Sequence, residues 1–467
     1  MNTAEKPMYE WETINWAKAQ RYVFKLQKRI YRASESGDVK AVRKLQRLLT
    51  KSWYSKIVAI EKVIQDNRGK NTPEIEPISL GIPRIEEKAK QALLKLALEP
   101  EWEAKFEPNS YGFRPGKSEH DAISAIYNSI CEKAKYVLEA DIEKCFDKID
   151  RSKLLEKLQT SPTFRKQIKA WLKSGVMDGK ALFPTNERTS QAGELSHLLA
   201  NIALDGIENL LNEKFSSRVG RTNAKQKISF VRYGDAFVLM DESLEVIIEA
   251  KAVVEKWLAE IGLTLKANKT RITHTFESHK GKMGFDFLGF NIRQYPCREK
   301  HSGLIGETTR KRGHKTLIKP SKEAIQRHLQ KIDYLLDKNI ASSQKQAIDA
   351  LNPVIRGWAA YYSTVASAET FRKIDNILFQ KLFGWAKRRR CRNHNNTDVV
   401  SKYWGVNRGL GWKFVTQDNK CILEKHQDTK TLRHCRDVIH RSRGTLKSQI
   451  IEEPNEVKVS CSVLKER

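Results

Sequence analysis

The sequence predicts an α+β fold, a layered domain followed by a mainly helical region, and three observations support it. Over the first ~300 residues, short β-rich runs alternate with stripes of helical period, an order typical of mixed layers. In "FVRYGDAFVLM" two apolar runs flank a Gly-Asp pair, the pattern of a tight β-hairpin. Beyond "KTLIKPSKEA" the apolar residues recur only at helical spacing.

The N-terminal segment predicts two helices. In the first, apolar side chains follow Trp16 on one face, at Ala19, Val23, Leu26 and Ile30. Nearly opposite lies a basic face, made of Lys18, Arg21, Lys25, Lys28, Arg29 and Arg32. Two interpretations of this face stay open, plain solvation and contact with phosphates. The second helix is predicted by a stripe at Val39, Val42, Leu45 and Leu49.

The middle of the chain predicts a linker, a helix and the first strand. The stretch from Asp66 to Pro83 is rich in Pro, Gly and Asn, which is typical of a loop. A helix follows in "EEKAKQALLKLALEP", and we expect it to end at Pro100. A strand is expected from Tyr136 to Asp141, with a turn and a helix directly after it.

The hairpin and its neighbours complete the predicted layer. The hairpin runs from Phe230 to Met240 and carries Asp235 at its tip. An amphipathic helix should follow before Gly262, with apolar residues at Leu244, Ile247, Ile248, Val254, Trp257, Leu258 and Ile261. "FDFLGFNIRQY" then predicts one more strand.

The C-terminal part predicts two long helices and a basic tail. One apolar stripe consists of Ile325, Leu329, Ile332 and Leu336, and the other of Phe371, Ile374, Leu378, Leu382 and Trp385. The second helix runs into "WAKRRR". The tail carries the aromatic residues Tyr403, Trp404, Trp412 and Phe414. These aromatic residues fit either a small core or a surface on which bases stack.

Charge is the strongest feature of the composition. The 467 residues hold 85 Lys+Arg against 56 Asp+Glu, a formal charge of +29, which predicts nucleic acid as the partner. No apolar run is long enough to span a membrane, and the N-terminus lacks the pattern of a secretion signal. Seven cysteines without a C-x-x-C pair predict reduced thiols, as in the cytoplasm.

Two aspartates combine position with useful chemistry. Asp141 ends a predicted strand, and Asp235 lies at the hairpin tip. Taken alone, each is most simply a turn residue. On adjacent strands they would form a hard-oxygen site for Mg²⁺, which polarises phosphates in nucleotidyl transfer. Spacing alone leaves open whether the two carboxylates meet.

Six stretches carry a family resemblance. They occur in the order "PNSYGFRPGKSEHDAI", "LEADIEKCFDKID", "VRYGDAFVLM", "GLTLKANKTRITH", "FDFLGFNIRQY" and "LNPVIRGWAAYYSTVASAETF". Together they resemble the group II intron-encoded reverse transcriptase/maturase family, from "WETINWAKAQRYVFKLQKRIYRAS" to about Trp412. The resemblance implies a right-hand polymerase fold, with fingers and palm followed by a helical thumb that carries the maturase signature "RGWAAYY".

The resemblance divides the chain into four expected regions. These are a basic N-terminal helical finger extension at 1–70, reverse-transcriptase fingers and palm at 71–300, a helical thumb/maturase (X) domain at 301–395, and a basic tail at 396–467, a candidate truncated DNA-binding region. Besides the N-terminal basic face, the expected RNA contacts are Arg356, Lys387, Arg388, Arg389 and Arg390.

The resemblance assigns Asp141 and Asp235 to catalysis and to metal binding, with Mg²⁺ as the metal if one is bound. In the family the hairpin tip reads Tyr-Ala-Asp-Asp, whereas here it reads Tyr-Gly-Asp-Ala, from Tyr233 to Ala236. The last carboxylate is therefore lost. Its loss removes negative charge that would offset a divalent cation in a two-metal site.

Two further departures affect the same site. The family stretch Pro-Gln-Gly-Gly…Ser-Pro, which lines the nucleotide and template site, reads "SQAGELSHLL" here. It differs from the family at Ser190, Ala192 and His197. Gln191 is kept and, with Tyr233, is the expected nucleotide or template contact. The segment from Thr72 to Leu80 is also much shorter than the family's cationic fingertip strands.

These features predict a group II intron maturase that binds intron RNA and promotes its splicing, with reverse transcriptase activity lost. The resemblance also allows reverse splicing and intron mobility as a ribonucleoprotein, with target DNA as a second partner. The alternative is a functional RNA-directed DNA polymerase with a variant active site. A third reading is a host splicing factor that serves other introns in trans. Without a C-x-x-C pair, the endonuclease of many family members is not expected.

Overall fold

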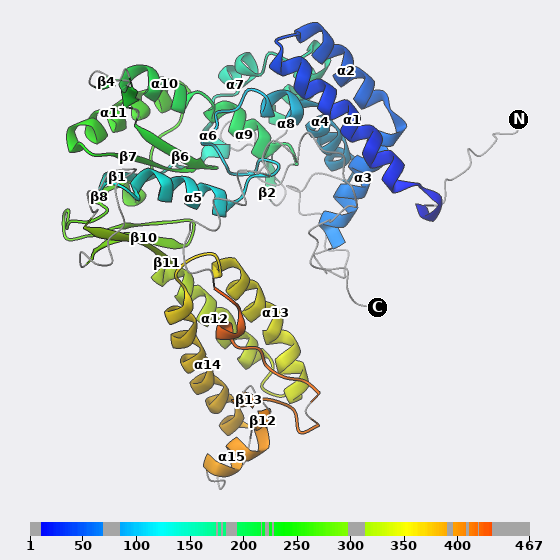
Figure 1. The fold of residues 1–467 in the computed structure, drawn as a ribbon. Helices are drawn as coiled ribbons and strands as arrows, with labels where there is room; N and C mark the ends of the chain where they lie inside the picture. Colours follow the sequence, from blue (N-terminus) through cyan, green and yellow to red (C-terminus); the bar gives the residue numbers. More distant parts are fainter. Residues whose placement is uncertain are drawn as a thin grey trace, which may run out of the picture.

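Three parts follow one another along the chain. The computed structural model describes residues 11–68, 85–173, 176–178, 181–183, 194–215, 217–219, 224–226, 228–297, 313–389, 396–407, 411–418 and 420–431. In Figure 1 the N-terminal helices lie on the right and a mixed domain of strands and helices lies on the left. Long helices project below that domain. We name these parts fingers, palm and thumb after the expected fold.

The N-terminal part of the fingers is a set of packed helices. They are η1 (Trp11–Thr13), α1 (Trp16–Glu35), α2 (Val39–Lys51), α3 (Trp53–Arg68) and α4 (Ile85–Glu103). The predicted stripe of α1 is confirmed, because Ala19, Val23, Leu26 and Ile30 are buried. Its first member, Trp16, is half-buried. In α2 the stripe holds except at Val39, which is 60% exposed at the start of the helix.

Helix α4 does not end at Pro100, and this expectation was wrong. The helix continues through the proline to Glu103. A proline inside a helix has no N–H for the carbonyl four residues earlier, here that of Leu96. That carbonyl instead accepts a hydrogen bond from Gln27 Nε2 of α1, at 3.1 Å. A side chain from another helix thus satisfies the group that Pro100 leaves without a donor.

The palm is built on a four-stranded antiparallel sheet in the order β6-β7-β1-β8. Its strands are β1 (Tyr136–Asp141), β6 (Ser229–Tyr233), β7 (Ala236–Asp241) and β8 (Arg271–His274). The predicted strand and hairpin are confirmed, with β1 beginning and ending as expected. Side chains alternate between two cores, so that Leu138 and Leu239 belong to one core and Val137 and Met240 to the other.

Helices and a second sheet cover the two faces of this sheet. The palm and inner finger helices are α5 (Glu119–Ile130), α6 (Cys145–Lys148), α7 (Arg151–Leu158), α8 (Pro162–Lys173), α9 (Ser196–Leu204), α10 (Ile207–Phe215) and α11 (Leu244–Glu260), with η3 at Ala267–Lys269. Helix α11 packs in one core and α5 in the other. On α11 the predicted stripe fails at Ile248, which is 53% exposed. Two short hairpins are β2 (Val176–Asp178) with β3 (Ala181–Phe183), and β4 (Ser217–Val219) with β5 (Ala224–Gln226).

"FDFLGFNIRQY" forms two strands and not the single strand that we expected. They are β9 (Phe285–Phe287) and β10 (Phe290–Pro296), and β11 (His314–Pro320) completes the sheet β11-β10-β9. Leu288 and Gly289 make the turn, with φ of 50° and 80°. A Cβ on Gly289 would lie 2.7 Å from the Tyr362 hydroxyl, which donates a hydrogen bond to the Gly289 carbonyl. This turn therefore joins palm and thumb.

The thumb consists of long helices that share one core. They are α12 (Lys322–Lys338), α13 (Gln344–Tyr362) and α14 (Ala368–Arg388), followed by α15 (Asn396–Tyr403), β12 (Trp404–Asn407), β13 (Gly411–Phe414) and η5 (His426–Asp428). The predicted stripe of α14 is confirmed at every position. The α12 stripe is confirmed at Ile332 and Leu336. Its first half is shifted by one residue, because Ala324 and His328 are buried and Ile325 and Leu329 only partly so.

The first part of the predicted tail packs into the thumb. Tyr403, Trp404 and Phe414 are buried in the same core as Trp385 of α14. The side chain of Asn352 on α13 donates to the Ile422 carbonyl at 3.0 Å and accepts from the Glu424 amide at 2.9 Å. Of the two interpretations of these aromatic residues, the packing favours a small core.

Candidate functional site

The tip of the β6–β7 hairpin is a two-residue turn. Tyr233 pairs with Ala236, and Gly234 and Asp235 lie between them. Gly234 has a φ of +63°, a conformation that glycine adopts without strain and that type II′ turns require at this place. A Cβ there would also lie 2.9 Å from the Phe113 ring. Conformation and packing both require glycine at this position.

The fold brings the two predicted aspartates together. Asp141 pairs with Ala236 across neighbouring strands, and the Ile142 N–H donates to the Asp235 carbonyl at 3.0 Å. The residue directly opposite Asp141 is thus the one that has lost its carboxylate. Among the described residues no group of three His, Cys, Asp or Glu side chains could hold a metal ion.

Lys269 contacts the carboxylate of Asp141. Its Nζ lies 2.7 Å from Asp141 Oδ2, and this hydrogen bond raises the pKa of Lys269. The charge of Asp235 adds to the effect. An ammonium group therefore balances charge that a divalent cation would otherwise balance. Two carboxylates can serve one Mg²⁺ that keeps waters and substrate phosphates as ligands, but this set is too small for a two-metal clamp.

A buried arginine beneath the tip holds it in place. Arg232 is fully buried and donates through Nη1 to Asn201 Oδ1 at 3.0 Å and to the Gly234 carbonyl at 3.2 Å. Burial lowers its pKa to about 10, against the opposing charges of Glu107 and Asp205. Sequence reasoning missed this residue, although a charge inside the apolar run "FVRY" is the signal that could have found it.

Aromatic side chains lie beside the tip. The ring of His197 on α9 is 4.0 Å from the ring of Phe113 and 5.5 Å from that of Phe146. Burial lowers the pKa of His197, which keeps its ring neutral at pH 7. Tyr233 donates its hydroxyl proton to Glu119 Oε1 at 2.7 Å, so it is tied to α5. Gln191, the other expected nucleotide contact, lies outside the described residues.

The predicted basic face of α1 is largely open to solvent. Its exposed members are Lys18, Arg21, Lys25, Arg29 and Arg32, and Lys28 is half-buried. Arg21 donates from Nε to the Ala17 carbonyl within the helix, at 3.2 Å. The opposite stripe packs against α2 and α4 in the finger core. The face keeps its expected geometry, and its contact with RNA stays a prediction.

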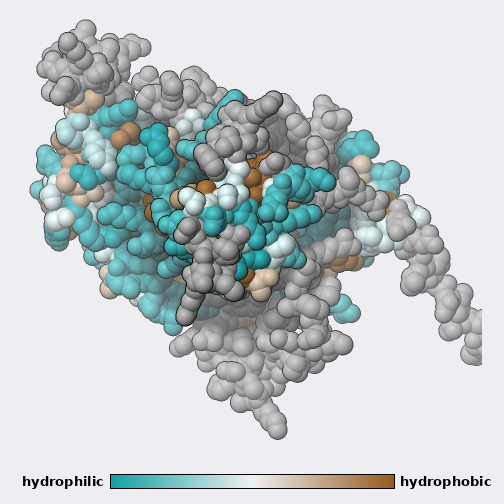
Figure 2. Space-filling model, turned by 90° about the horizontal axis from the view of Figure 1, so that it is seen from below, coloured by the Kyte–Doolittle hydropathy of each residue, from teal (hydrophilic) through white to brown (hydrophobic). Residues whose placement is uncertain are grey.

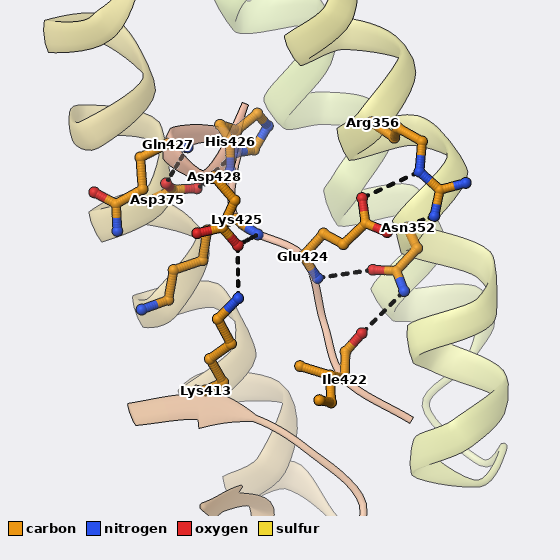
Figure 3. A network of polar contacts seen from close by, with 10 residues as sticks. All are labelled: Asn352, Arg356, Asp375, Lys413, Ile422, Glu424, Lys425, His426, Gln427 and Asp428. Carbon is orange, nitrogen blue, oxygen red and sulfur yellow. Dashed lines mark hydrogen bonds and ion pairs between the residues drawn. The ribbon is translucent and has the colours of Figure 1, made fainter. Parts of the chain in front are cut away.

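The predicted thumb cations already contact protein groups. Arg356 forms an ion pair with Glu424, through Nε at 3.2 Å and through Nη2 (Figure 3). Arg388 pairs with Asp337 at 3.0 Å, and Lys387 lies 5.3 Å from the Phe383 ring. Arg389 donates to the carbonyls of Ile340 and Ser342 and covers the Trp385 ring. Arg389 thus has a structural role. Arg390 lies outside the described residues.

A buried network ties the C-terminal segment to the thumb. Asp375 of α14 accepts from the backbone of His426 and Gln427 and contacts His426 Nδ1 at 2.6 Å (Figure 3). His426 Nε2 lies 2.7 Å from Nε2 of His328, whose ring stacks on Trp358. Neither histidine was singled out from the sequence, because their contact joins residues 98 positions apart.

Much of the surface around these elements is polar. Figure 2 shows that hydrophilic residues make up most of the coloured surface seen from below, with hydrophobic residues gathered near its centre. None of the described helices is long and apolar enough to cross a membrane.

Comparisons with known proteins agree with this architecture. Residues 70–292 match the family model described as reverse transcriptase (RNA-dependent DNA polymerase), and residues 11–93 match the N-terminal domain of reverse transcriptase. Residues 325–404 match the maturase-specific domain of group II introns. The chain is therefore a reverse transcriptase-like protein of right-hand polymerase fold. It belongs to the group II intron-encoded reverse transcriptase/maturase family.

Its curated relatives are distant. Protein YkfC of Escherichia coli is 27% identical over 274 residues, which is 52% of this chain and 69% of that one. Group II intron-encoded protein LtrA of Lactococcus lactis is 26% identical, over 60% of this chain and 53% of its own length. Maturase-like protein 1 of Euglena gracilis is 24% identical, over 75% of this chain and 77% of its own length. The chain thus spans about half of LtrA.

Solved structures overlap only loosely. Telomerase from Candida albicans in complex with a fragment of telomeric RNA is 11% identical, with a TM-score of 0.34, over 78% of this chain and 55% of that one. At this overlap the fold assignment rests on the sheet, the helices and the family models.

Proposed function

We propose that this chain is a maturase that binds group II intron RNA and promotes its splicing in the cytoplasm. The observation that carries the proposal is a folded maturase-specific thumb joined to a palm in which Ala236 stands opposite Asp141. The RNA supplies the chemistry of splicing, and the protein stabilises the active fold of the RNA. The chain has a formal net charge of +29, and its neutralisation of RNA phosphates supplies much of the affinity for RNA.

Three features support loss of DNA synthesis. The third carboxylate is absent, Asp141 is paired with Lys269, and the His197 ring packs against Phe113 beside the tip. The lost carboxylate and the histidine at position 197 depart from the family, and the ammonium of Lys269 competes with a divalent cation for Asp141. The scaffold beneath the tip, anchored by Arg232, supports retention of the fold for another purpose.

A functional RNA-directed DNA polymerase with a variant site is the second candidate. It is favoured by Asp141 and Asp235, which stay adjacent on the palm sheet. Mg²⁺ would bind between the two carboxylates if the side chain of Lys269 moved away from Asp141. Reverse splicing as a ribonucleoprotein with target DNA stays with the proposed maturase, and completed intron mobility also requires DNA synthesis.

Two assays separate the candidates. The first measures splicing of the intron that flanks the gene, at low Mg²⁺, with and without the protein. We expect splicing to need the protein there, and no stimulation at any protein concentration would contradict the proposal. The second measures primer extension on an RNA template, and robust incorporation of dNTPs would favour the polymerase.

A further inference from the structure

The outer edge of the palm sheet carries a hollow that the proposed function does not use. It has a volume of about 370 Å³, and its apolar lining comes from Leu138 of β1 and Ile272 of β8. Strand β8 is an edge strand whose one neighbour in the sheet is β1. Pockets that hold small ligands begin at about 300 Å³, so the hollow is large enough for about one nucleotide.

Basic side chains line the hollow. Lys251 comes from α11, and His279, Lys280 and Lys282 come from the turn after β8. Arg271 also lies there, but its guanidinium is neutralised by two hydrogen bonds to Glu139, at 2.7 and 3.0 Å. Lys251 has a partner in Glu255 at 3.6 Å. Within the described part of the chain, Lys280 and Lys282 have no ion-pair partner.

The turn that carries these lysines has a defined shape. His279 and Lys282 exchange backbone hydrogen bonds of 2.9 and 3.1 Å, and the two residues between them have φ of +49° and +78°. Positive φ at both central positions is the pattern of a type I′ turn, which fixes the direction of the flanking side chains. The His279 ring also packs edge-on against Tyr136, with centroids 5.7 Å apart. Two lysines for which the described residues supply no ion-pair partner are thus held at one rim of the hollow.

We propose that this hollow binds the phosphodiester backbone of a single RNA strand, as a second contact site for the RNA that the proposed function requires. Lys280 and Lys282 pair with phosphates, and the partly exposed Ile272 contacts a ribose or a base. In Figure 1, β8 and α1 lie at opposite sides of the molecule. Contacts at both sides would let one protein hold two separate parts of a folded RNA.

The test compares two double variants that remove the same charge. Lys280→Gln/Lys282→Gln removes the proposed contacts. Lys153→Gln/Lys256→Gln removes two exposed lysines that do not line the hollow. Binding of the intron RNA is measured from 50 to about 300 mM KCl, and thermal melting checks the fold. Two lost contacts should lower the log–log salt slope by about 1.4 and weaken binding roughly 25-fold at 0.1 M.

A second readout locates the RNA directly. A photo-crosslinking residue at Met283, which follows Lys282 and is 41% exposed, should cross-link to the intron RNA. The photo-crosslinking residue placed at Lys256 instead should not cross-link to the intron RNA. Equal salt slopes for the two double variants, or no cross-link from position 283, would overturn the inference while the proposed function stands. A wild-type protein without affinity for intron RNA would overturn both.

Discussion

At the scale of single residues, the site is defined by what contacts Asp141. The aspartate keeps its place at the end of β1, but a methyl group faces it on β7 and the ammonium of Lys269 lies 2.7 Å from it. A lysine can neutralise one carboxylate, yet it cannot bridge two phosphate oxygens as a divalent ion does. In our proposal, the role that remains for this aspartate is charge balance and structure.

Restoring one carboxylate should not restore DNA synthesis. We expect Ala236→Asp to give no detectable extension of a primed RNA template, because Lys269 still pairs with Asp141 and His197 still packs beside the tip. Ala236→Asn is the matched control, with similar size and no charge. Robust extension of the primed template by Ala236→Asp protein would show that the missing carboxylate was the sole defect.

At the scale of elements, distant side chains complete local structure. Helix α4 crosses Pro100 because Gln27 of α1 reaches the Leu96 carbonyl. The segment at 420–431 stays on the thumb through Asp375, His426 and Asn352. In both cases an element that is locally unfavourable is made stable by a partner on another element.

The pairing of Gln27 with Pro100 can be tested by a double-mutant cycle. Gln27→Ala should lower the free energy of unfolding by about 1–2 kcal/mol, because it leaves the Leu96 carbonyl without a donor. In a Pro100→Ala background the same change should cost much less, since the alanine introduced there would supply its own N–H. Equal costs of Gln27→Ala in the two backgrounds, measured by urea unfolding, would refute this account of α4.

The thumb should lose stability in weak acid. Burial, and then the neighbouring His426, lower the pKa of His328 to about 3 from an ordinary value near 6.5. Below pH ~6.5 the unfolded chain therefore binds a proton that the folded chain does not bind. The contribution of this group to the free energy of unfolding is fully present above pH ~6.5 and falls steadily toward pH 3. His328→Phe keeps a ring on Trp358 but removes the titrating group.

The measurement is the melting temperature of the thumb transition between pH 7.5 and 5. The melting temperature of the wild-type protein should fall as the pH is lowered over this range. The melting temperature of His328→Phe should be lower at pH 7.5 and should fall less. Parallel curves for the two proteins would mean that another group controls the pH dependence.

The sequence predicts elements whose patterns are local and misses contacts between distant positions. Strand β1 and the buried stripe of α14 follow from local signals alone, a short β-rich run and a helical period. The partner of Asp141 lies 128 residues away, and although Lys269 belongs to one of the stretches that carry the resemblance, nothing local in that stretch points to Asp141. The same reason explains the α12 stripe, whose register depends on the burial of His328 against His426. The adjacency of Asp141 and Asp235 was predicted only through the family resemblance.

At the scale of the whole molecule, we propose that fingers, palm and thumb offer separate surfaces to one RNA. The basic face of α1 points away from the finger core, and the thumb keeps Arg356 and Arg388 exposed in ion pairs. Ion pairs at the surface are weak, so phosphates can replace their acidic partners at small cost.

Neutralising the α1 face should flatten the salt dependence of RNA binding. The variant carries Lys18→Gln, Arg21→Gln, Arg29→Gln and Arg32→Gln, and each lost contact should lower the log–log slope by about 0.7. The fold should survive, because exposed substitutions of this kind usually cost under about 0.5 kcal/mol each. A slope equal to that of wild type would assign this face to solvation and leave the thumb and palm as the RNA surfaces.

The most direct test of the central claim is splicing by a protein without either aspartate. If the RNA carries the chemistry, Asp141→Ala/Asp235→Ala protein should stimulate splicing of the flanking intron at low Mg²⁺ nearly as well as wild type does. Thermal melting must first show that the double variant is folded. Loss of splicing stimulation in a folded double variant would contradict the claim, because the palm carboxylates would then take part in the function.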